Sequence, residues 1–136
     1  MGIVSSKEVS GQRKIKSETG NFIRYRGTLN GRPDWCENWC IEEWGDKVVL
    51  KAIDCPGNFL CALSDGTVGL EQQHPNDCPE SIWIPSKNLD GTYSFISARN
   101  TWLTYSHPVG PGNKLICSAK KYHELKESEK FTLPPW

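Results

Sequence analysis

Cysteine, histidine and acidic side chains are the groups of this 136-residue chain that could bind a metal or perform catalysis. The six cysteines include no Cys-x-x-Cys pair. His74 and Cys78 have a ligand-like spacing, but the sequence offers them no two obvious further ligands. Glu42 and Glu43 are adjacent, which does not make an acid–base pair, and no Ser-His-Asp motif or phosphate-binding loop is visible. The sequence therefore predicts a protein that is not an enzyme and needs no metal or cofactor.

The cysteines are expected to be reduced thiols. An even number of cysteines would also suit a secreted disulfide framework. The N-terminal twenty residues, however, contain no apolar stretch of signal-peptide length, which predicts a cytoplasmic protein with free thiols. Cys61 and Cys117 lie within apolar runs, where a thiol acts as a small buried hydrophobic group.

Basic residues are the first group that could bind a partner. Sixteen Lys and Arg balance sixteen Asp and Glu, so a nucleic-acid-binding function, which needs a basic excess, is not expected. Local patches remain, because basic residues gather near both ends of the chain. If they converge, they would bind an acidic protein surface or phospholipid head groups; the alternative is dispersed, solvated charge. The candidates are Arg24, Arg26, Arg32, Lys114, Lys120 and Lys121.

Tryptophan residues are the second group. Trp39 and Trp102 occupy core-like positions, whereas Trp83 lies between two isoleucines and is expected to face away from them. An exposed tryptophan beside acids or amides suits a sugar, because the ring stacks on the apolar sugar face while polar groups bind the hydroxyls. Trp44 and Trp83 are therefore the candidate sugar-binding residues, unless these rings cover the ends of the fold.

The N-terminus begins Met-Gly-Ile-Val-Ser-Ser, which matches the pattern for myristoylation of Gly2 after removal of Met1. One acyl chain gives marginal membrane binding, and nearby cations would assist it on an anionic surface. The sequence therefore predicts a flexible leader over residues 1–11 and suggests peripheral membrane association. An ordinary disordered leader is the alternative.

The elements that must position these residues are short strands. Apolar or alternating runs are separated by Gly, Pro, Asn and Asp, which is typical of an all-β domain. Three units carry the same order: a strand, a turn rich in Gly or Asn, an aromatic–aliphatic pair, and a strand led by Glu. The matching segments are 14–17, 20–23 and 37–41; 49–52, 57–60 and 80–85; and 95–98, 100–103 and 129–134.

Three units of about four strands fit a β-trefoil, since three propeller blades cannot close a ring. The expected fold is one β-trefoil domain over residues 12–136. Its repeats are predicted to span residues 12–44, 45–88 and 89–136.

The second unit resembles the trefoil repeat of the fascins and of hisactophilin. The resemblance rests on VLKA at 49–52, GNFLCA at 57–62 and DGTV at 65–68, and similar motifs recur in the third unit. It implies a β-trefoil that binds filamentous actin and, as in hisactophilin, reaches membranes through an N-terminal acyl group. The chain departs from hisactophilin because it has only three histidines. Amaranthin-type lectins share the repeat pattern, while the Gln-x-Trp signature of ricin-type lectins is absent.

Two functions follow from these residues. The main expectation is a cytoskeletal, actin-binding protein. The alternative is a carbohydrate-binding trefoil lectin, which a deep pocket lined by Trp44 or Trp83 would favour.

Overall fold

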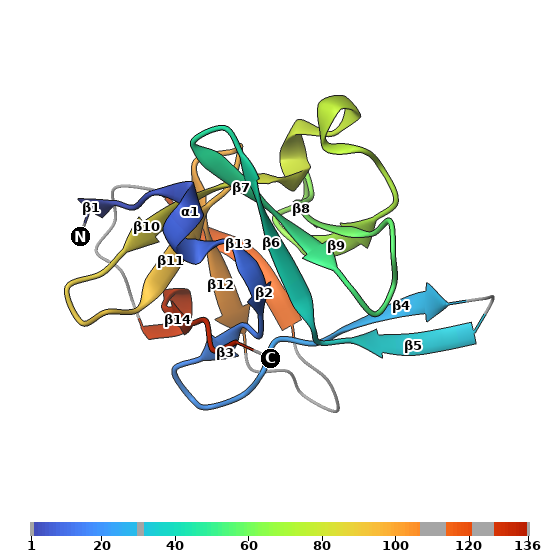
Figure 1. Ribbon diagram of the computed structural model, residues 1–136, viewed down its shortest axis with the longest axis horizontal. Coiled ribbons are helices and arrows are strands. Elements are labelled where there is room, and N and C mark those ends of the chain that lie inside the picture. The colour runs from blue at the N-terminus through green and yellow to red at the C-terminus, as the bar shows by residue number, and fades with distance from the viewer. Residues whose placement is uncertain (1, 30–31, 107–113, 121–126, 136) are drawn as a thin grey trace.

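The computed structural model describes residues 2–29, 32–106, 114–120 and 127–135 (Figure 1). Its strands are β1 (Gly2–Ile3), β2 (Gly11–Arg13), β3 (Lys16–Ser17), β4 (Tyr25–Leu29), β5 (Arg32–Cys36), β6 (Trp39–Trp44), β7 (Lys47–Ala52), β8 (Phe59–Ala62), β9 (Val68–Glu71), β10 (Ile82–Lys87), β11 (Tyr93–Ile96), β12 (Thr101–Ser106), β13 (Lys114–Lys120) and β14 (Phe131–Thr132). The helical pieces are α1 (Ser6–Val9), η1 (Pro75–Asp77), η2 (Pro79–Ser81) and η3 (Glu127–Glu129). The all-β class predicted from the sequence is confirmed.

Antiparallel pairing joins the described strands into one large sheet and one hairpin. The large sheet follows the order β13-β12-β11-β10-β7-β6-β2, with β8 and β9 branching from β7. β14 pairs with both β11 and β3, so the last strand lies beside one of the first (Figure 1). β4 and β5 pair only with each other and extend away from the other strands. The pairing of β3 with β14 places residues 16–17 beside residues 131–132.

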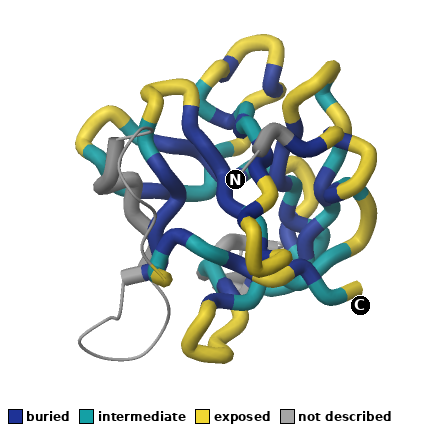
Figure 2. Tube along the Cα trace, turned by 90° about the vertical axis from the view of Figure 1, so that its left-hand side faces the viewer, coloured by how far each residue is buried: buried dark blue, intermediate teal, exposed yellow. Residues whose placement is uncertain are grey.

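Corresponding residues of the three units fill the core, with Phe95 and Trp83 each one position away from the matches that the sequence segments predicted. The members of each set occupy comparable places in their units, and all of them are fully buried. Burial of each such side chain contributes about 1.5–3 kcal/mol relative to exposure. Figure 2 shows the buried segments running through the interior, with the exposed segments at the turns. The three sets are Ile15, Leu50 and Phe95; Ile23, Leu60 and Leu103; and Trp39, Trp83 and Phe131.

One turn of each unit also has the same backbone form. Gly20, Gly57 and Asn100 have positive φ values of 89°, 86° and 59°. Glycine adopts this left-handed conformation without a steric penalty, and Asn tolerates it better than most residues. Two of these turns are closed alike, since the amides of Ser17 and Ser97 donate across them at 2.8 Å. The Gly and Asn residues that mark the sequence repeats therefore have a direct conformational cause.

Residues 2–10 are ordered and packed rather than the flexible leader expected from the sequence. β1 pairs with β10, and α1 follows directly. The Ser6 hydroxyl donates to a backbone carbonyl in the β6–β7 turn at 2.9 Å. Val4 and Val9 are buried in the core. The apolar contacts of these two valines explain the difference, because they anchor both ends of the segment.

A disulfide joins Cys36 to Cys55, with the two Cα atoms 6.3 Å apart. The expectation that all six cysteines are reduced is therefore wrong for this pair. Cys36 ends β5, so the bond attaches the β4–β5 hairpin to the turn that follows β7. The Tyr25 hydroxyl at the base of the hairpin also donates to the carbonyl of Val68 at 2.6 Å. A two-stranded hairpin is marginally stable alone, and these two links fix its base.

Candidate functional site

A pocket of about 230 Å³ lies where the first and last parts of the chain meet. It is lined by Ser17, Glu18, Thr19, Tyr105, Glu127 and Ser128. These residues come from the turn after β3, from β12 and from η3. Ser17 stands opposite Phe131 in the β3–β14 ladder, which places the turn beside η3. The pocket therefore depends on the closure of the fold by β14.

Hydrogen bonds fix the hydroxyl groups on the β3 side of the pocket. The hydroxyls of Ser17 and Thr19 lie 2.8 Å apart. The side-chain amide of Asn21 donates to the Thr19 hydroxyl at 3.0 Å, and the Asn21 backbone N–H donates to the Ser17 hydroxyl at 3.3 Å. Each hydroxyl oxygen has further hydrogen-bonding capacity. The turn thus presents two preoriented hydroxyls at the pocket wall.

Carboxylates give the pocket an acidic rim. Loss of water contact raises the pKa of Glu18, and the carboxylates of Glu127 and Asp90 raise it further. A hydrogen bond between the Glu18 and Glu127 side chains acts in the same direction. Lys130 partly offsets this charge, because its ammonium lies 3.5 Å from Glu127 and 3.6 Å from Asp90. Three acids therefore share one nearby lysine.

Tyr105 is the aromatic residue among the described residues that line the pocket, and it is almost fully buried. An aromatic ring beside hydroxyls and carboxylates can bind a polyhydroxylated ligand, since the ring contacts C–H groups while the oxygens bind hydroxyls. The described residues that line the pocket include no cysteine or histidine. Within the described ranges, no group of three potential metal ligands comes together.

Trp83 does not line a surface site, and its assignment as a sugar-binding residue is wrong. Its side chain is fully buried, and the indole N–H donates to the carbonyl of Leu60 at 2.9 Å. The strand register places Trp83 opposite Val48, which is also fully buried. The neighbouring Ile82 and Ile84 are the partly exposed positions of β10. Trp39 and Trp102 are buried, as predicted.

Trp44, the other candidate for stacking on a sugar, lies at the end of β6 and is partly exposed. Its ring meets the edge of His74 with the ring centres 5.7 Å apart and the planes at 65°. His74 is itself held, because its Nδ1 accepts the backbone N–H of Asn76 at 3.2 Å.

The basic candidates lie on separate elements. Arg26 and Arg32 belong to the β4–β5 hairpin, whereas Lys114 and Lys120 belong to β13 in the large sheet. Lys121 is outside the described residues.

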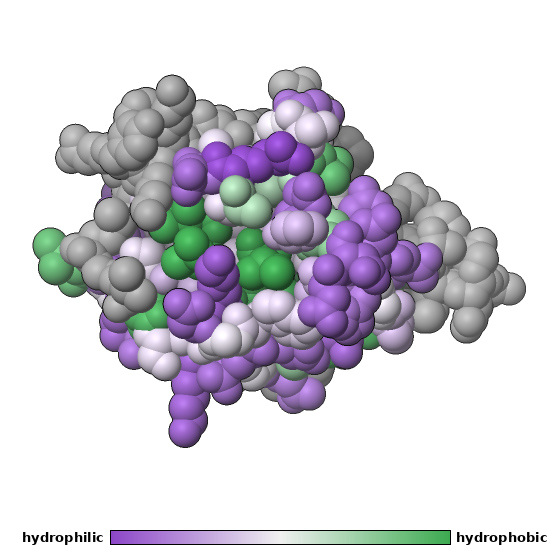
Figure 3. Space-filling model, turned by 90° about the horizontal axis from the view of Figure 1, so that it is seen from above, coloured by the Kyte–Doolittle hydropathy of each residue, from purple (hydrophilic) through white to green (hydrophobic). Residues whose placement is uncertain are grey.

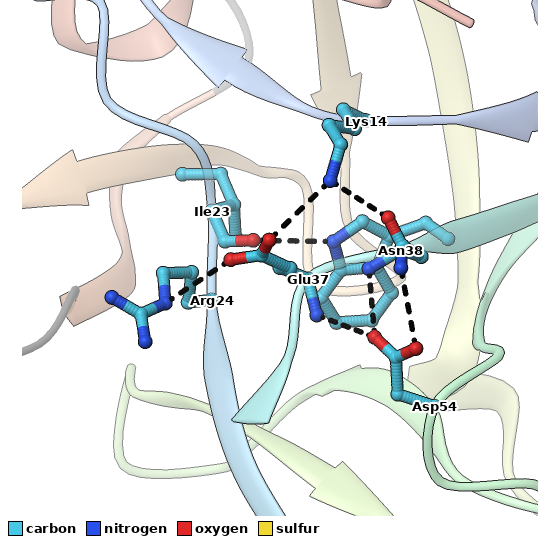
Figure 4. A network of polar contacts seen from close by, with 7 residues as sticks. Lys14, Ile23, Arg24, Glu37, Asn38 and Asp54 are labelled. Carbon is cyan, nitrogen blue, oxygen red and sulfur yellow. Dashed lines mark hydrogen bonds and ion pairs between the residues drawn. The ribbon is translucent and has the colours of Figure 1, made fainter. Parts of the chain in front are cut away.

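Arg24 has a local partner, because its Nε lies 3.3 Å from a carboxylate oxygen of Glu37 (Figure 4). The same carboxylate lies 3.4 Å from the ammonium of Lys14. Asp54 accepts the backbone N–H groups of Glu37 and Asn38, both at 3.0 Å. Arg24 therefore contributes to a structural network that holds the start of β6.

Gly2, the lipidation candidate, lies in β1 opposite Lys87 of β10. The described part of the chain has no helix with the length and apolarity to cross a membrane.

Large hydrophobic side chains are exposed mainly at separate places on the described surface. Among the described residues, Phe22 and Leu89 are the large hydrophobic residues that are exposed. The ammonium groups of Lys14 and Lys16 lie 5.4 and 5.6 Å from the centre of the Phe22 ring. Figure 3 shows hydrophobic residues near the middle of the upper face, with hydrophilic residues between and around them. The pocket remains the better-defined ligand site.

The chain matches no known family model and no curated protein by sequence. It does resemble solved structures. One is of a mosquitocidal holotoxin, with a TM-score of 0.73 and 13% identity over 93% of this chain and 17% of that chain. Another is the lysenin pore, with a TM-score of 0.59 and 17% identity over 94% of this chain and 49% of that chain. This chain therefore spans less than half the length of either protein.

The expectation of an actin-binding cytoskeletal protein is contradicted by these comparisons. The two solved structures are a mosquitocidal holotoxin and the lysenin pore, neither of which is a fascin, and at 13% and 17% identity they share the fold with this chain. The repeat motifs at 49–52, 57–62 and 65–68 did not predict the function, because they encode strand, turn and core positions. Such positions are shared by proteins with unrelated binding surfaces.

No sequence signal marked the pocket directly. Ser17, Thr19 and Ser128 are ordinary polar residues, and Tyr105 is one of four tyrosines. The repeat hypothesis offered an indirect signal, because a closed three-unit fold must bring its first and last units together. Applying that closure to residues 17–19 and 127–128 would have placed them on one surface.

Proposed function

We propose that this chain is a non-enzymatic β-trefoil module that binds neutral carbohydrates. The observation that carries the proposal is the pocket, where an aromatic ring, hydroxyls and carboxylates meet. The threefold recurrence of buried residues and of left-handed turns supports the trefoil assignment. The likeness to parts of two larger toxins supports a role as a recognition module.

Binding would use the two kinds of surface in the pocket. The Tyr105 ring would contact the apolar face of a sugar, and the hydroxyls of Ser17, Thr19 and Ser128 would exchange hydrogen bonds with its hydroxyls. The carboxylates of Glu18 and Glu127 would accept sugar O–H groups, and such charge-assisted bonds are stronger than neutral ones. The same carboxylates would repel sialylated or sulfated glycans.

The module would act in an oxidising compartment rather than in the cytoplasm. The Cys36–Cys55 disulfide supports this placement, because structural disulfides persist mainly outside the reducing cytosol. In the two toxins the similar part is 17% and 49% of the chain. A glycan-binding module of such a protein would direct it to a cell surface.

A glycan panel with neutral, sialylated and sulfated members tests the proposal. We expect binding to neutral members, followed by an affinity loss of about tenfold for Glu127→Gln, because a charged acceptor is lost. Glu42→Gln is the matched control, since Glu42 pairs with Lys51 at 3.4 Å and does not line the pocket. Its affinity should equal that of the parent.

Two results would reject the pocket. The first is an absence of binding to any glycan on the panel. The second is binding that Trp44→Phe abolishes while Glu127→Gln leaves it intact, which would move the site to the Trp44–His74 pair.

A further inference from the structure

Two buried thiols lie close together outside the pocket. The Sγ atoms of Cys61 and Cys78 lie 3.9 Å apart. Cys61 belongs to β8, whereas Cys78 lies between η1 and η2. Both residues are at most 5% exposed, and both are free thiols in this structure. The chain between them contains β9 and η1.

The surroundings hold both sulfur atoms in place. The Cys78 thiol lies 3.4 Å from a carboxylate oxygen of Glu80 and donates to it. The backbone N–H and hydroxyl of Ser81 donate to the Cys78 carbonyl at 3.0 and 2.8 Å. Cys61 is fixed within β8, whose next strand β9 pairs with it in full register. A bond of about 2.0 Å would require the sulfurs to move together by roughly 2 Å, within reach of side-chain rotation.

We propose that Cys61 and Cys78 form a second disulfide when the protein meets an oxidising thiol buffer. The chain already carries one disulfide, Cys36–Cys55, so an environment that maintains that bond can oxidise this pair. Cys40 lies on a third element, β6, and is partly buried. The inference is independent of the proposed sugar-binding function.

Oxidised glutathione is the co-reactant that balances the reaction. The Cys78 thiolate attacks one glutathione sulfur and expels the first reduced glutathione as a thiolate. Cys61, after losing its proton to solvent, attacks the Cys78 sulfur of the mixed disulfide and expels the second. The two cysteines lose two electrons and two protons in total. The two glutathione thiolates take up those protons.

The thiols react slowly at neutral pH. Burial raises the pKa of Cys61, as do Cys78 and the carboxylates of Glu71 and Glu80. Burial also raises the pKa of Cys78, and its hydrogen bond to Glu80 adds to this effect. Because the thiolate is the nucleophile, the oxidation is best performed at about pH 8.5.

The new bond would attach the η1–η2 segment to β8. It would close the loop from 61 to 78 and restrict the unfolded chain, which stabilises the folded state. His74 lies within this loop and contacts Trp44, so the bond would also limit separation of that aromatic pair. Proteases that cleave the loop after local opening should then act more slowly.

Peptide mapping after incubation with oxidised glutathione tests the proposal. The protein is alkylated under denaturing conditions, digested without reductant and analysed by mass spectrometry. We expect a linked peptide pair containing Cys61 and Cys78, with Cys40 alkylated. Limited proteolysis of the loop from 63 to 77 should slow about tenfold, and added reductant should reverse this.

Matched variants separate this bond from general oxidation. Cys40→Ser should leave the linked peptide and the slower proteolysis unchanged. Cys61→Ser should abolish both and leave Cys78 available for alkylation. If Cys61→Ser fails to fold, the mapping of the parent protein still decides the question. Alkylation of both Cys61 and Cys78 in protein with a closed Cys36–Cys55 bond would overturn the proposal, as would a link from either to Cys40.

Discussion

The carboxylates of Glu37 and Glu18 belong to the same sequence unit but have opposite surroundings. Glu37 lies between two cations, Lys14 and Arg24, and its backbone N–H is bound by Asp54 (Figure 4). Glu18 lies beside other acids, and its pKa is raised. In the first arrangement the charged groups pair with one another within the protein and stabilise the fold. The second leaves acidic oxygens at a pocket, where a ligand can bind them.

Removing the acceptor at the centre of the Glu37 network should have the largest effect. Asp54→Ala leaves the backbone N–H groups of Glu37 and Asn38 without their acceptor and should cost about 2–3 kcal/mol of unfolding free energy. Urea unfolding followed by tryptophan fluorescence measures the change. Asp65→Ala, which removes an exposed turn contact to Thr67, is the control and should cost less. Equal losses in the two variants would show that the network has no special role.

Loss of the Glu37 charge alone should have a smaller effect. Glu37→Gln removes the ion pairs with Lys14 and Arg24, but the Glu37 side chain is 40% exposed and water screens both pairs. We expect a loss of about 0.5–1 kcal/mol that shrinks when salt is raised to about 1 M. Unfolding at low and high salt provides the measurement. A loss that does not depend on salt would contradict an electrostatic role.

The core could be predicted from sequence because apolar residues repeat in matched positions. Ile23, Leu60 and Leu103 are such a set, and all three are fully buried. Trp83 escaped the prediction because η2 precedes β10 and shifts the strand phase relative to the first unit. A shift of one residue turns every side chain of a strand to the other face. Trp83 does face away from Ile82 and Ile84, as alternation predicts, but Trp83 faces the core and the two isoleucines are the partly exposed positions.

The disulfide and the pocket depend on contacts that sequence spacing does not encode. Six cysteines permit many pairings, and only the turn after β7 places Cys55 beside Cys36. The pocket combines residues 17–19 with Tyr105 and residues 127–128. Their approach follows from the β3–β14 pairing, which is a property of the closed fold rather than of any local motif.

Removing the Glu18 charge from the pocket should have the smallest effect on stability. It should stabilise the protein, whereas changes to the Glu37 network destabilise it. Loss of water contact and, after it, the neighbouring acids raise the pKa of Glu18 in the folded protein, so the folded state binds this proton more tightly than the unfolded state does. The contribution of protonated Glu18 to the unfolding free energy is fully present below the ordinary carboxyl pKa. It is lost as the pH rises through the raised pKa of the folded state. Glu18→Gln should therefore stabilise the protein at pH 7 by about 0.3–0.5 kcal/mol after solvent screening.

The stability gained by Glu18→Gln should disappear when the pH is lowered. At pH 4 the parent carries the proton on Glu18, so the parent and Glu18→Gln should unfold at nearly equal urea concentrations. Glu37→Gln should show the reverse sign at pH 7, because it removes attraction where Glu18→Gln removes repulsion. Destabilisation by Glu18→Gln at pH 7 would mean that Glu18 is a structural partner like Glu37. The contrast between the Glu37 network and the pocket would then be wrong, because it depends on Glu18 having no such structural partner.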